Sequence, residues 1–327
     1  MKKKLNGVFE GGGVKGTGLV GAIAVGEELG YEFVHVAGTS AGAIVAAFVA
    51  AGYKAKEMKE ILDGLDYLKF KDKGPEDYIP MVGSLVSLFL TKGIYEGDFF
   101  EQWIRKLLEA KNIHTFSDLV IPEHQGDLRY RYKLSVIVSD ITKGNLVILP
   151  EDIADYGWDP DELNVARAVR MSMSLPFFYR PVVLKDRKGT PHYIVDGGIL
   201  SNFPVWIYDD DEYGSPWPTL GYKLVEPEAR PHAIRGPVTL FAALFSTMME
   251  AHDARYIKDA NFMRTIPIPT LGIQTTEFEI TKERKEALYQ SGVNAAKEFF
   301  EKWNFERYKV EIQKKEVEGR RERIWKV

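Results

Sequence analysis

Residues 33–50 read FVHVAGTSAGAIVAAFVA, and this stretch decides the fold. Its first five residues are rich in β-branched and aromatic side chains, which predicts a strand over residues 33–37. The alanine-rich run after it predicts a helix that ends near Gly52. Between the two, the sequence GTSAG over residues 38–42 matches the pattern G-x-S-x-G. In that pattern a nucleophilic serine occupies a strained turn that needs a strand before it and a helix after it. Both flanks are predicted here.

Ser40, at the centre of this turn, is therefore predicted to be a nucleophile. Gly38 and Gly42 allow the neighbouring backbones to approach closely. The N-terminus of the following helix favours negative charge beside the serine. A serine at this position would also serve as the N-cap of that helix. An N-cap explains the serine, but it does not explain the two flanking glycines.

The segments around this turn alternate between strand and helix. A short strand is predicted over residues 5–9, and a glycine-rich turn leads from it into a helix over residues 17–29. Gly30 occupies the position at which glycine commonly ends a helix. The order strand-helix-strand-helix begins a parallel sheet that is covered on both faces. We therefore predict an α/β fold, with three α/β/α layers and a mainly parallel central sheet.

The rest of the chain is predicted to extend this sheet within one domain, residues 1–305. A variable region over about residues 54–125 is less regular and is expected to form helices outside the sheet. The charged residues 306–327 read as a solvated tail. Further elements are predicted as two hairpins, one strand and one amphipathic helix: residues 133–139 with 146–149, 182–185 with 193–195, 220–225, and 282–304.

The sequence GGGVKG, residues 11–16, follows the first strand and opens the first helix. It contains the dinucleotide pattern G-x-G-x-x-G, but that site needs an acidic residue at the end of the second strand, and Glu32 lies at its start. A P-loop needs a lysine where Thr17 stands. Consecutive backbone N–H groups beside a nucleophile instead suggest an oxyanion hole, in which one donor is worth about 2.7–4 kcal/mol. A tight turn alone does not require four glycines.

A serine hydrolase usually recruits a histidine as its base. None of the histidines has a distinctive position at a strand end: His35, His114, His124, His192, His232 and His252. Asp196 does, because it follows a predicted strand that Gly197 and Gly198 break at once. A carboxylate at this place in an α/β sheet is often in an active site, although an Asp-Gly hairpin turn would look the same. Asp140 is a rival, but the turn over residues 142–145 makes it look structural.

Composition excludes several other classes of site and partner. The chain has 327 residues, a formal net charge of -4 and no cysteine. Nucleic acid is therefore not an expected partner, and disulfides, a thiolate nucleophile and a Cys-based zinc site are excluded. The apolar run after the N-terminal lysines stops at Glu10, which argues against a signal peptide. No stretch reaches the ~18 apolar residues of a spanning helix, and residues 41–53 and 238–249 read as packed helices. The protein is expected to be cytoplasmic, and peripheral at a membrane at most.

Residues 11–16, 38–42 and 196–198 together resemble the motifs of the patatin-like phospholipase family. The stretches MSMSLPFF, residues 171–178, and LSNFP, residues 200–204, also look like the family's segments at these places. The resemblance covers about residues 5–205. It implies a modified α/β-hydrolase-like sheet and a Ser–Asp dyad that hydrolyses lipid acyl esters without histidine, metal or cofactor.

Carried over residue by residue, the resemblance makes Ser40 the nucleophile and Asp196 the base. It makes Gly11, Gly12 and Gly13 oxyanion donors with Lys15 nearby. Five further glycines are carried over as residues that support these motifs: Gly16, Gly38, Gly42, Gly197 and Gly198. Glu10 departs from the aspartate or glycine that many members have before the glycines.

The expected substrate is a phospholipid or another lipid ester, as for a phospholipase A or lysophospholipase. An acyltransferase would share every one of these residues and differ only in the acceptor of the acyl group. A nucleotide-binding regulatory protein that uses the glycine loop is a more distant alternative. The apolar residues 78–95, which carry no charge after Tyr78 and before Lys92, suggest either a segment that meets the lipid interface or ordinary core.

Overall fold

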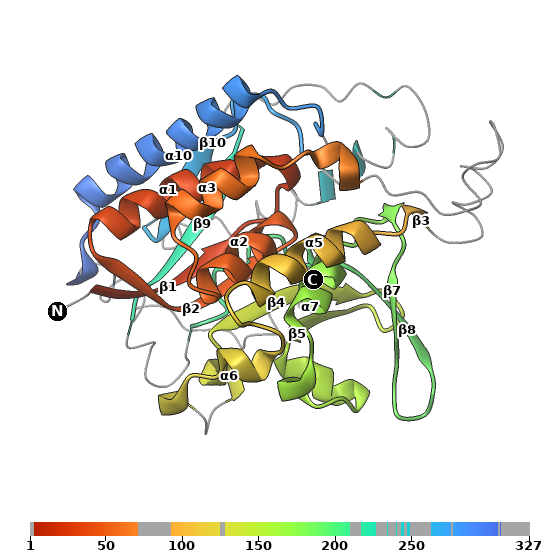
Figure 1. Cartoon of the computed structure of the whole chain (residues 1–327). Helices are drawn as coiled ribbons and strands as arrows, with labels where there is room; N and C mark the ends of the chain where they lie inside the picture. The colour runs from red at the N-terminus through yellow and green to blue at the C-terminus, as the bar shows by residue number, and fades with distance from the viewer. Residues whose placement is uncertain are drawn as a thin grey trace.

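The computed structural model describes residues 3–70, 93–124, 128–209, 217–226, 263–275 and 277–306, together with residues 234, 240, 243, 244, 247, 248 and 308. An eight-stranded sheet runs through the molecule in the order β10-β9-β1-β2-β4-β8-β7, with β5 also paired to β4 (Figure 1). Helices flank this sheet. The predicted α/β fold with a mainly parallel central sheet is confirmed.

Five neighbouring strands of the sheet are parallel: β10 (Thr265–Pro269), β9 (Thr219–Val225), β1 (Lys3–Phe9), β2 (Tyr31–Thr39) and β4 (Leu134–Asp140). Three strands pair antiparallel: β5 (Asn145–Leu149), β7 (Val182–Lys185) and β8 (Pro191–Asp196). The two predicted hairpins, β4–β5 and β7–β8, are confirmed. β10 was not predicted, and neither was the small parallel pair β3 (Gly93–Tyr95) and β6 (Phe177–Tyr179).

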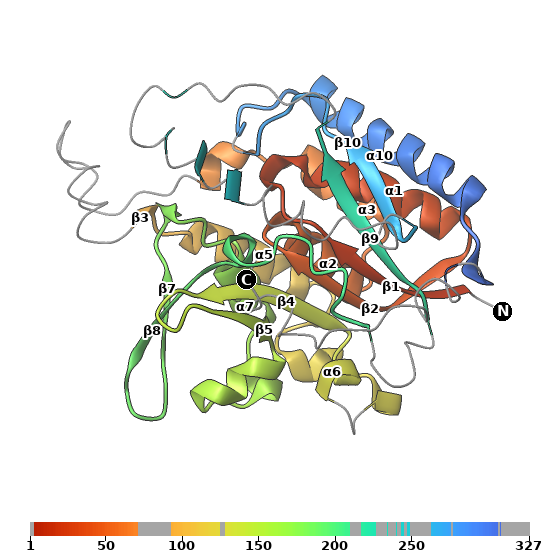
Figure 2. The ribbon, with the colours of Figure 1, turned by 180° about the vertical axis from the view of Figure 1, so that it is seen from behind.

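The larger helices lie on one face of the sheet, and the view from behind shows the strands in front of them (Figure 2). They are α1 (Gly16–Glu28), α2 (Ala41–Ala50), α3 (Ala55–Asp63), α5 (Asp98–Glu109), α7 (Val165–Ser172) and α10 (Lys282–Lys302). The short elements are α6 (Leu128–Arg131), η1 (Gly13–Lys15), η2 (Tyr67–Phe70), η4 (Phe116–Leu119), η5 (Pro122–His124), η6 (Glu151–Tyr156), η7 (Pro160–Glu162) and η8 (Gly197–Ile199).

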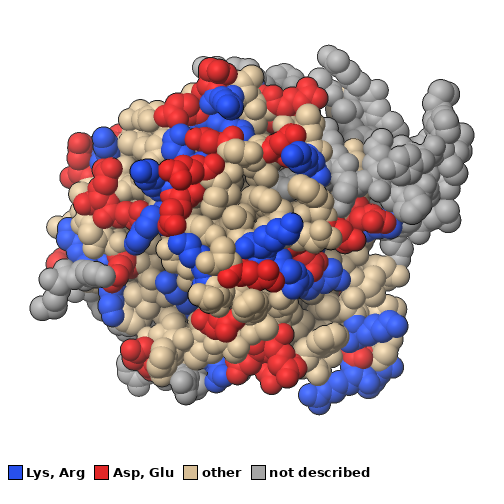
Figure 3. Space-filling view, in the orientation of Figure 1, with Lys and Arg blue, Asp and Glu red and all other residues tan. Residues whose placement is uncertain are grey.

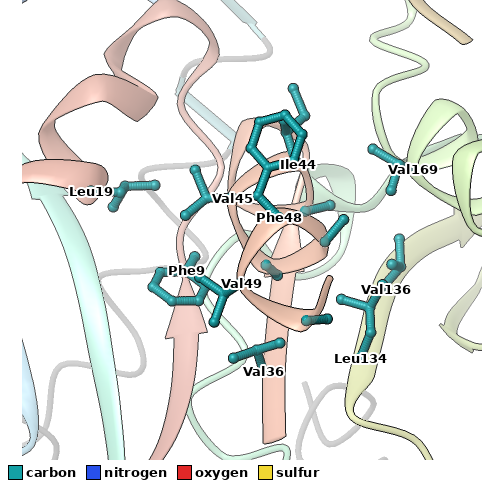
Figure 4. Close-up of a cluster of buried hydrophobic side chains, with 14 of the residues drawn as sticks. Phe9, Leu19, Val36, Ile44, Val45, Phe48, Val49, Leu134, Val136 and Val169 are labelled. Atoms are coloured by element: carbon teal, nitrogen blue, oxygen red, sulfur yellow. The ribbon is translucent and has the colours of Figure 1, made fainter. Parts of the chain in front are cut away.

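The central strands are buried on both faces, as their apolar sequences predict. Toward the helices, Phe9, Val36 and Val136 pack against α2, every residue of which is buried (Figure 4). The alternate residues point to the opposite face, because successive side chains of a strand alternate. There, Val8 and Ala37 pack against residues 203–208. Burial on both faces fixes the register of β1 and β2, and so fixes where each strand ends.

The carboxyl ends of strands β2 and β8 meet along one edge of β4. β5 pairs with residues Val136 to Asp140 of β4, so it occupies the opposite edge of β4 along the residues that the ends of β2 and β8 reach. On the shared edge, Thr39 at the end of β2 pairs with Ile137, and Asp196 at the end of β8 pairs with Val138. β2 runs parallel to β4 and β8 antiparallel, so their carboxyl ends face each other. The residues that follow these two ends are therefore neighbours.

Acidic and basic side chains are interspersed over the face that α1, α3 and α10 cover, and neither sign forms a large patch there (Figure 3). Among the residues that the structure describes, no helix is long and apolar enough to cross a membrane. Residues 238–249 were expected to be a packed helix, but the side chains of Leu240, Leu244 and Met248 are 41%, 51% and 41% exposed. Of the predicted interfacial segment 78–95, only β3 lies within the described residues.

Candidate active site

Ser40 forms a one-residue turn between the end of β2 and the start of α2. Its φ of 53° and ψ of −125° are unusual for a residue with a side chain, and such backbone strain costs about 1–3 kcal/mol and often occurs at active sites. The flanking glycines make the turn possible. A Cβ atom at Gly38 would collide with the carbonyl group of Gly42, and one at Gly42 would collide with the carbonyl oxygen of Phe9. The predicted strand-turn-helix context of Ser40 is confirmed.

The backbone and side chain of Ser40 are both engaged by the segment that follows α7. Its N–H donates to Ser172 Oγ at 2.9 Å, and its hydroxyl donates to Met173 Sδ at 3.6 Å. A thioether sulfur is a weak acceptor, and a hydroxyl hydrogen rotates to suit its partner. Ser40 Oγ is therefore held near Met173 by a contact that a stronger acceptor would displace.

Asp196 is the last residue of β8 and is fully buried beside this turn. Its Oδ1 accepts from the Gly198 N–H at 2.8 Å, and its own N–H donates to the Ser174 carbonyl oxygen at 2.9 Å. Oδ2 is buried and accepts no well-aligned hydrogen bond from the described residues. One oxygen is thus used to fix the carboxyl group, and the other remains open to accept a proton.

Burial raises the pKa of Asp196 to about 7, because the charged carboxylate loses its hydration. The Gly198 N–H and the nearby Ser40 hydroxyl oppose part of this shift by stabilising the charged form. A carboxyl group with a pKa near neutrality accepts protons far better than an ordinary aspartate, whose pKa is about 3.9. The environment of Asp196 therefore suits it to act as a general base.

The glycine loop lies directly against Ser40. A Cβ atom at Gly11 would lie 2.2 Å from Asn202 Oδ1 and 3.1 Å from the Cβ of Ser40, so the absence of a side chain lets the loop approach both residues closely. The Gly11 N–H donates to the Asn202 carbonyl oxygen at 3.2 Å, and Asn202 Nδ2 donates back to the Gly11 carbonyl oxygen at 3.2 Å. Asn202 thus fixes the loop at Gly11, the residue that lies against Ser40.

Within the loop, the N–H groups of Gly12 and Gly13 donate to no acceptor among the described residues. Those of Val14 and Lys15 are used by Thr275 and Gly12 carbonyl oxygens, both at 3.2 Å. The Gly11 N–H, expected to be an oxyanion donor, is bonded to the Asn202 carbonyl oxygen in this arrangement, so its role as a donor stays a prediction. The side chain of Lys15 lies close to Gly12, so Lys15 is near the glycine loop.

Glu10, which departs from the family pattern, forms a buried ion pair. Its Oε1 lies 2.8 Å from Lys223 Nζ on β9, and its Oε2 accepts from the Leu224 N–H. The Lys223 ammonium also lies 5.1 Å from the centre of the Phe203 ring. The pair ties the start of the glycine loop to the neighbouring strand, so Glu10 has a structural function outside the reacting groups.

The described histidines are not bonded to Ser40 or Asp196. His35 is buried in β2, where its ring bonds Asn6 Oδ1 at 3.1 Å, and burial lowers its pKa to about 4. His192 Nδ1 bonds Asp140 Oδ2 at 2.9 Å, and Asp140 Oδ1 accepts from the backbone of its own turn at Thr142. Asp140 is therefore structural, as expected. His232 and His252 lie outside the described residues.

No set of three or more His, Asp or Glu side chains in the described ranges is placed to hold a metal ion. The large groove between β10 and α10, with a volume of about 840 Å³, is lined by residues such as Pro267, Leu271 and Trp303. None of the dyad or glycine-loop residues lines it.

The glycine loop, the serine turn and the buried aspartate all lie within a segment that matches one family model. The model of the family described as patatin-like phospholipase matches residues 7–208. The chain belongs to this family. Family membership supports lipid ester hydrolysis as the general class of activity.

The chain is also similar to other proteins in sequence and to a solved structure in fold. The uncharacterized protein YqhO of Bacillus subtilis is 42% identical over 304 residues, which cover 92% of this chain and 99% of that protein. A protein of Acanthamoeba polyphaga mimivirus is 26% identical over 90% of this chain and 92% of its own length. The crystal structure of VipD from Legionella pneumophila has the same fold, with a TM-score of 0.55 and 22% identity over 92% of this chain and 67% of VipD.

Four residues at this patatin-like site were not assigned a role from the sequence. Ser172, Met173 and Ser174 contact Ser40 or Asp196, and Asn202 fixes the glycine loop. All four lie in the two stretches that resemble the family around residues 171–178 and 200–204. The resemblance therefore pointed to these stretches, but it could not assign a role to each residue, because the residues that they contact are distant in sequence.

Proposed function

We propose that the protein hydrolyses lipid acyl esters with Ser40 as nucleophile and Asp196 as the sole protein base. The observation that carries this proposal is the fully buried carboxyl group of Asp196, with its pKa raised to about 7 and one oxygen open beside the strained Ser40 turn. A base with a pKa near the working pH is the most effective. No described histidine bonds either residue.

In the first half of the reaction, Ser40 Oγ attacks the acyl carbonyl carbon while its proton passes to Asp196 Oδ2. Hydrogen bonds of a catalytic group are often long without substrate and shorten when it binds. The carbonyl oxygen becomes negatively charged and accepts from the Gly12 and Gly13 N–H groups. The tetrahedral intermediate then expels the alcohol, which takes the proton from Asp196 and leaves an acyl group on Ser40.

In the second half, a water molecule attacks the acyl-enzyme and gives its proton to Asp196. The new oxyanion is held by the same two N–H groups. Its collapse breaks the bond to Ser40 Oγ, which recovers the proton from Asp196. The fatty acid leaves, and the enzyme returns to its starting protonation state.

The substrate class is tested by incubating the purified protein with phospholipid vesicles and with a soluble lysophospholipid, and measuring released fatty acid by mass spectrometry. We expect release by the wild type and none by the Ser40→Ala variant. Transfer of the acyl group to an added alcohol in preference to water would make the protein a transacylase with the same dyad. If no phospholipid, lysophospholipid or neutral glyceride is cleaved by protein whose Ser40 is reactive, lipid esters are the wrong substrate class.

A further inference from the structure

Ser172, the last residue of α7, joins the nucleophile to the central sheet. Its side chain is fully buried, and its Oγ accepts from the Ser40 N–H at 2.9 Å. The same hydroxyl donates to the Ile137 carbonyl oxygen at 2.6 Å. Both hydrogen-bonding functions of this hydroxyl are therefore used, one on the Ser40 turn and one on β4.

Ile137 is the point on β4 where the two halves of the dyad meet. It pairs with Thr39 at the end of β2, and the next residue of β4 pairs with Asp196. The pairing of β2 with β4 stops at Thr39, because Ser40 turns away at a φ of 53°. Beyond Thr39, the Ser172 hydroxyl replaces the backbone pairing and links the Ser40 N–H to the Ile137 carbonyl oxygen of β4.

The residues next to Ser172 contact the dyad as well. Met173 Sδ accepts from the Ser40 hydroxyl, and the Ser174 carbonyl oxygen accepts from the Asp196 N–H. Ser174 is itself held, because its Oγ accepts from Nη1 of the buried Arg170 at 2.6 Å. The last residue of α7 and the two residues after it thus contact Ser40 and Asp196 between them.

We propose that Ser172 is a positioning residue that sets the place of Ser40 Oγ relative to Asp196 and the glycine loop. This inference rests on the proposed function of Ser40 as nucleophile. The Ser172 hydroxyl holds the backbone from which the nucleophile projects, and it also occupies the Ser40 N–H. The negative oxygen of the intermediate is consequently directed to Gly12 and Gly13. Small displacements of a reacting group lower rates strongly, by as much as about a hundredfold for 1 Å.

Ser172→Ala, Ser172→Cys and the wild type form the test series. Cysteine has nearly the shape of serine, but its thiol forms only weak hydrogen bonds. Each protein is assayed for kcat and KM on a soluble p-nitrophenyl ester, for the rate of fluorophosphonate labelling at Ser40, and for its melting temperature. We expect kcat and the labelling rate to fall together by about ten- to a hundredfold in Ser172→Ala, with Ser172→Cys in between. KM should be unchanged, because Ser172 does not face the substrate.

Ser135→Ala is the matched control. Ser135 is also a nearly buried serine, it lies on β4 two residues before Ile137, and its Oγ accepts from the Tyr208 hydroxyl at 3.5 Å. This variant should keep kcat near the wild-type value whatever it does to stability. If Ser172 had a purely structural function, Ser172→Ala and Ser135→Ala would have similar melting temperatures and similar kcat.

The inference is overturned if folded Ser172→Ala keeps kcat within twofold of the wild type. If that variant does not fold, Ser172→Cys decides, and wild-type kcat in it has the same meaning. Failure of the proposed function looks different, because it would appear as activity or labelling that survives Ser40→Ala in the parent protein. The Ser172 variants are compared only after labelling of the parent protein has been shown to depend on Ser40. Failure of the Ser172 inference can therefore be distinguished from failure of the proposed function.

Discussion

At the scale of single residues, the buried carboxyl group of Asp196, as the proposed base, should determine how activity depends on pH. Its pKa is raised to about 7 by burial, and the base works only when it is deprotonated. kcat/KM for a soluble ester should therefore rise as the pH increases from 5 to 8, with a midpoint near 7. Below the midpoint it should fall about tenfold for each pH unit.

The pH profile is measured on a short soluble ester, so that changes in lipid packing do not contribute. Circular dichroism at each pH checks that the protein stays folded. A profile that is flat from pH 5 to 8 would mean that the base has an ordinary aspartate pKa, and it would remove the physical basis for a dyad without histidine.

Met173 makes the nucleophile sensitive to oxidation. Its sulfur lies 3.6 Å from Ser40 Oγ and its side chain is partly exposed, so peroxide that enters the site can convert it to the sulfoxide. The added oxygen is a strong acceptor that competes with Asp196 for the Ser40 proton. We expect hydrogen peroxide to lower wild-type activity severalfold in step with oxidation of Met173, and to leave Met173→Leu largely unaffected.

Peptide mapping provides an internal control for this oxidation, because Met171 is two residues away in sequence but only 1% exposed. Met171 should remain unoxidised when Met173 reacts. Equal inactivation of the wild type and Met173→Leu by peroxide would show that another methionine is responsible.

At the scale of elements, the glycine loop depends on the buried pair between Glu10 and β9. Lys223→Met removes the ammonium group that neutralises the Glu10 carboxylate, and breaking such a pair costs about 3–5 kcal/mol. The free energy of unfolding, measured with urea, should fall by about that amount. Replacing both charges, with Glu10→Gln and Lys223→Met, should recover most of the loss. A single variant within about 1 kcal/mol of the wild type would show that the pair does not hold this loop.

The elements also show how far the sequence could lead. Alternating strand and helix patterns predicted β1, α1, β2 and α2, because apolar periodicity and glycine turns are local signals. β10 could not be found in this way, because Pro267 and Pro269 argue against a strand and are tolerated only at the edge where it lies.

The meeting of the serine turn and the glycine loop was predictable, because both follow the carboxyl ends of neighbouring parallel strands. The position of Asp196 was not predictable in this way, because β8 runs antiparallel to β4 and its end faces the end of β2. The contacts that complete the site were not predictable either. Ser172 and Ser40 are 132 residues apart, and a bond between a side chain and a distant N–H leaves no periodic pattern. Gly11 shows the same limit, since only the fold reveals that its N–H is taken by Asn202.

At the scale of the whole molecule, a lipid substrate requires contact with a lipid surface. Leu240, Leu244 and Met248 are exposed at helical spacing, and Thr247 Oγ1 bonds the Ala243 carbonyl oxygen four residues earlier. No acidic residue occurs between Glu228 and Glu250. Such an apolar face without acidic residues suits the boundary of anionic lipid. We expect Leu244→Asp to reduce binding to anionic vesicles severalfold and to spare hydrolysis of a soluble ester.

Leu29→Asp is the matched control for this surface, because Leu29 is a similarly exposed leucine, at 44%, that follows α1. It should leave vesicle binding unchanged. Equal losses of vesicle binding in the two variants would mean that the residues around Leu244 have no special affinity for lipid.

The central claim is that Ser40 is a nucleophile activated by Asp196 without a histidine. It is tested most directly by reacting the folded protein with a fluorophosphonate and following the labelling rate and site by mass spectrometry. We predict a single label on Ser40, a rate at least about a hundredfold lower in Asp196→Asn, and a rate near that of the wild type in His192→Ala. A label on another residue, or unchanged labelling of Ser40 in Asp196→Asn, would contradict the dyad.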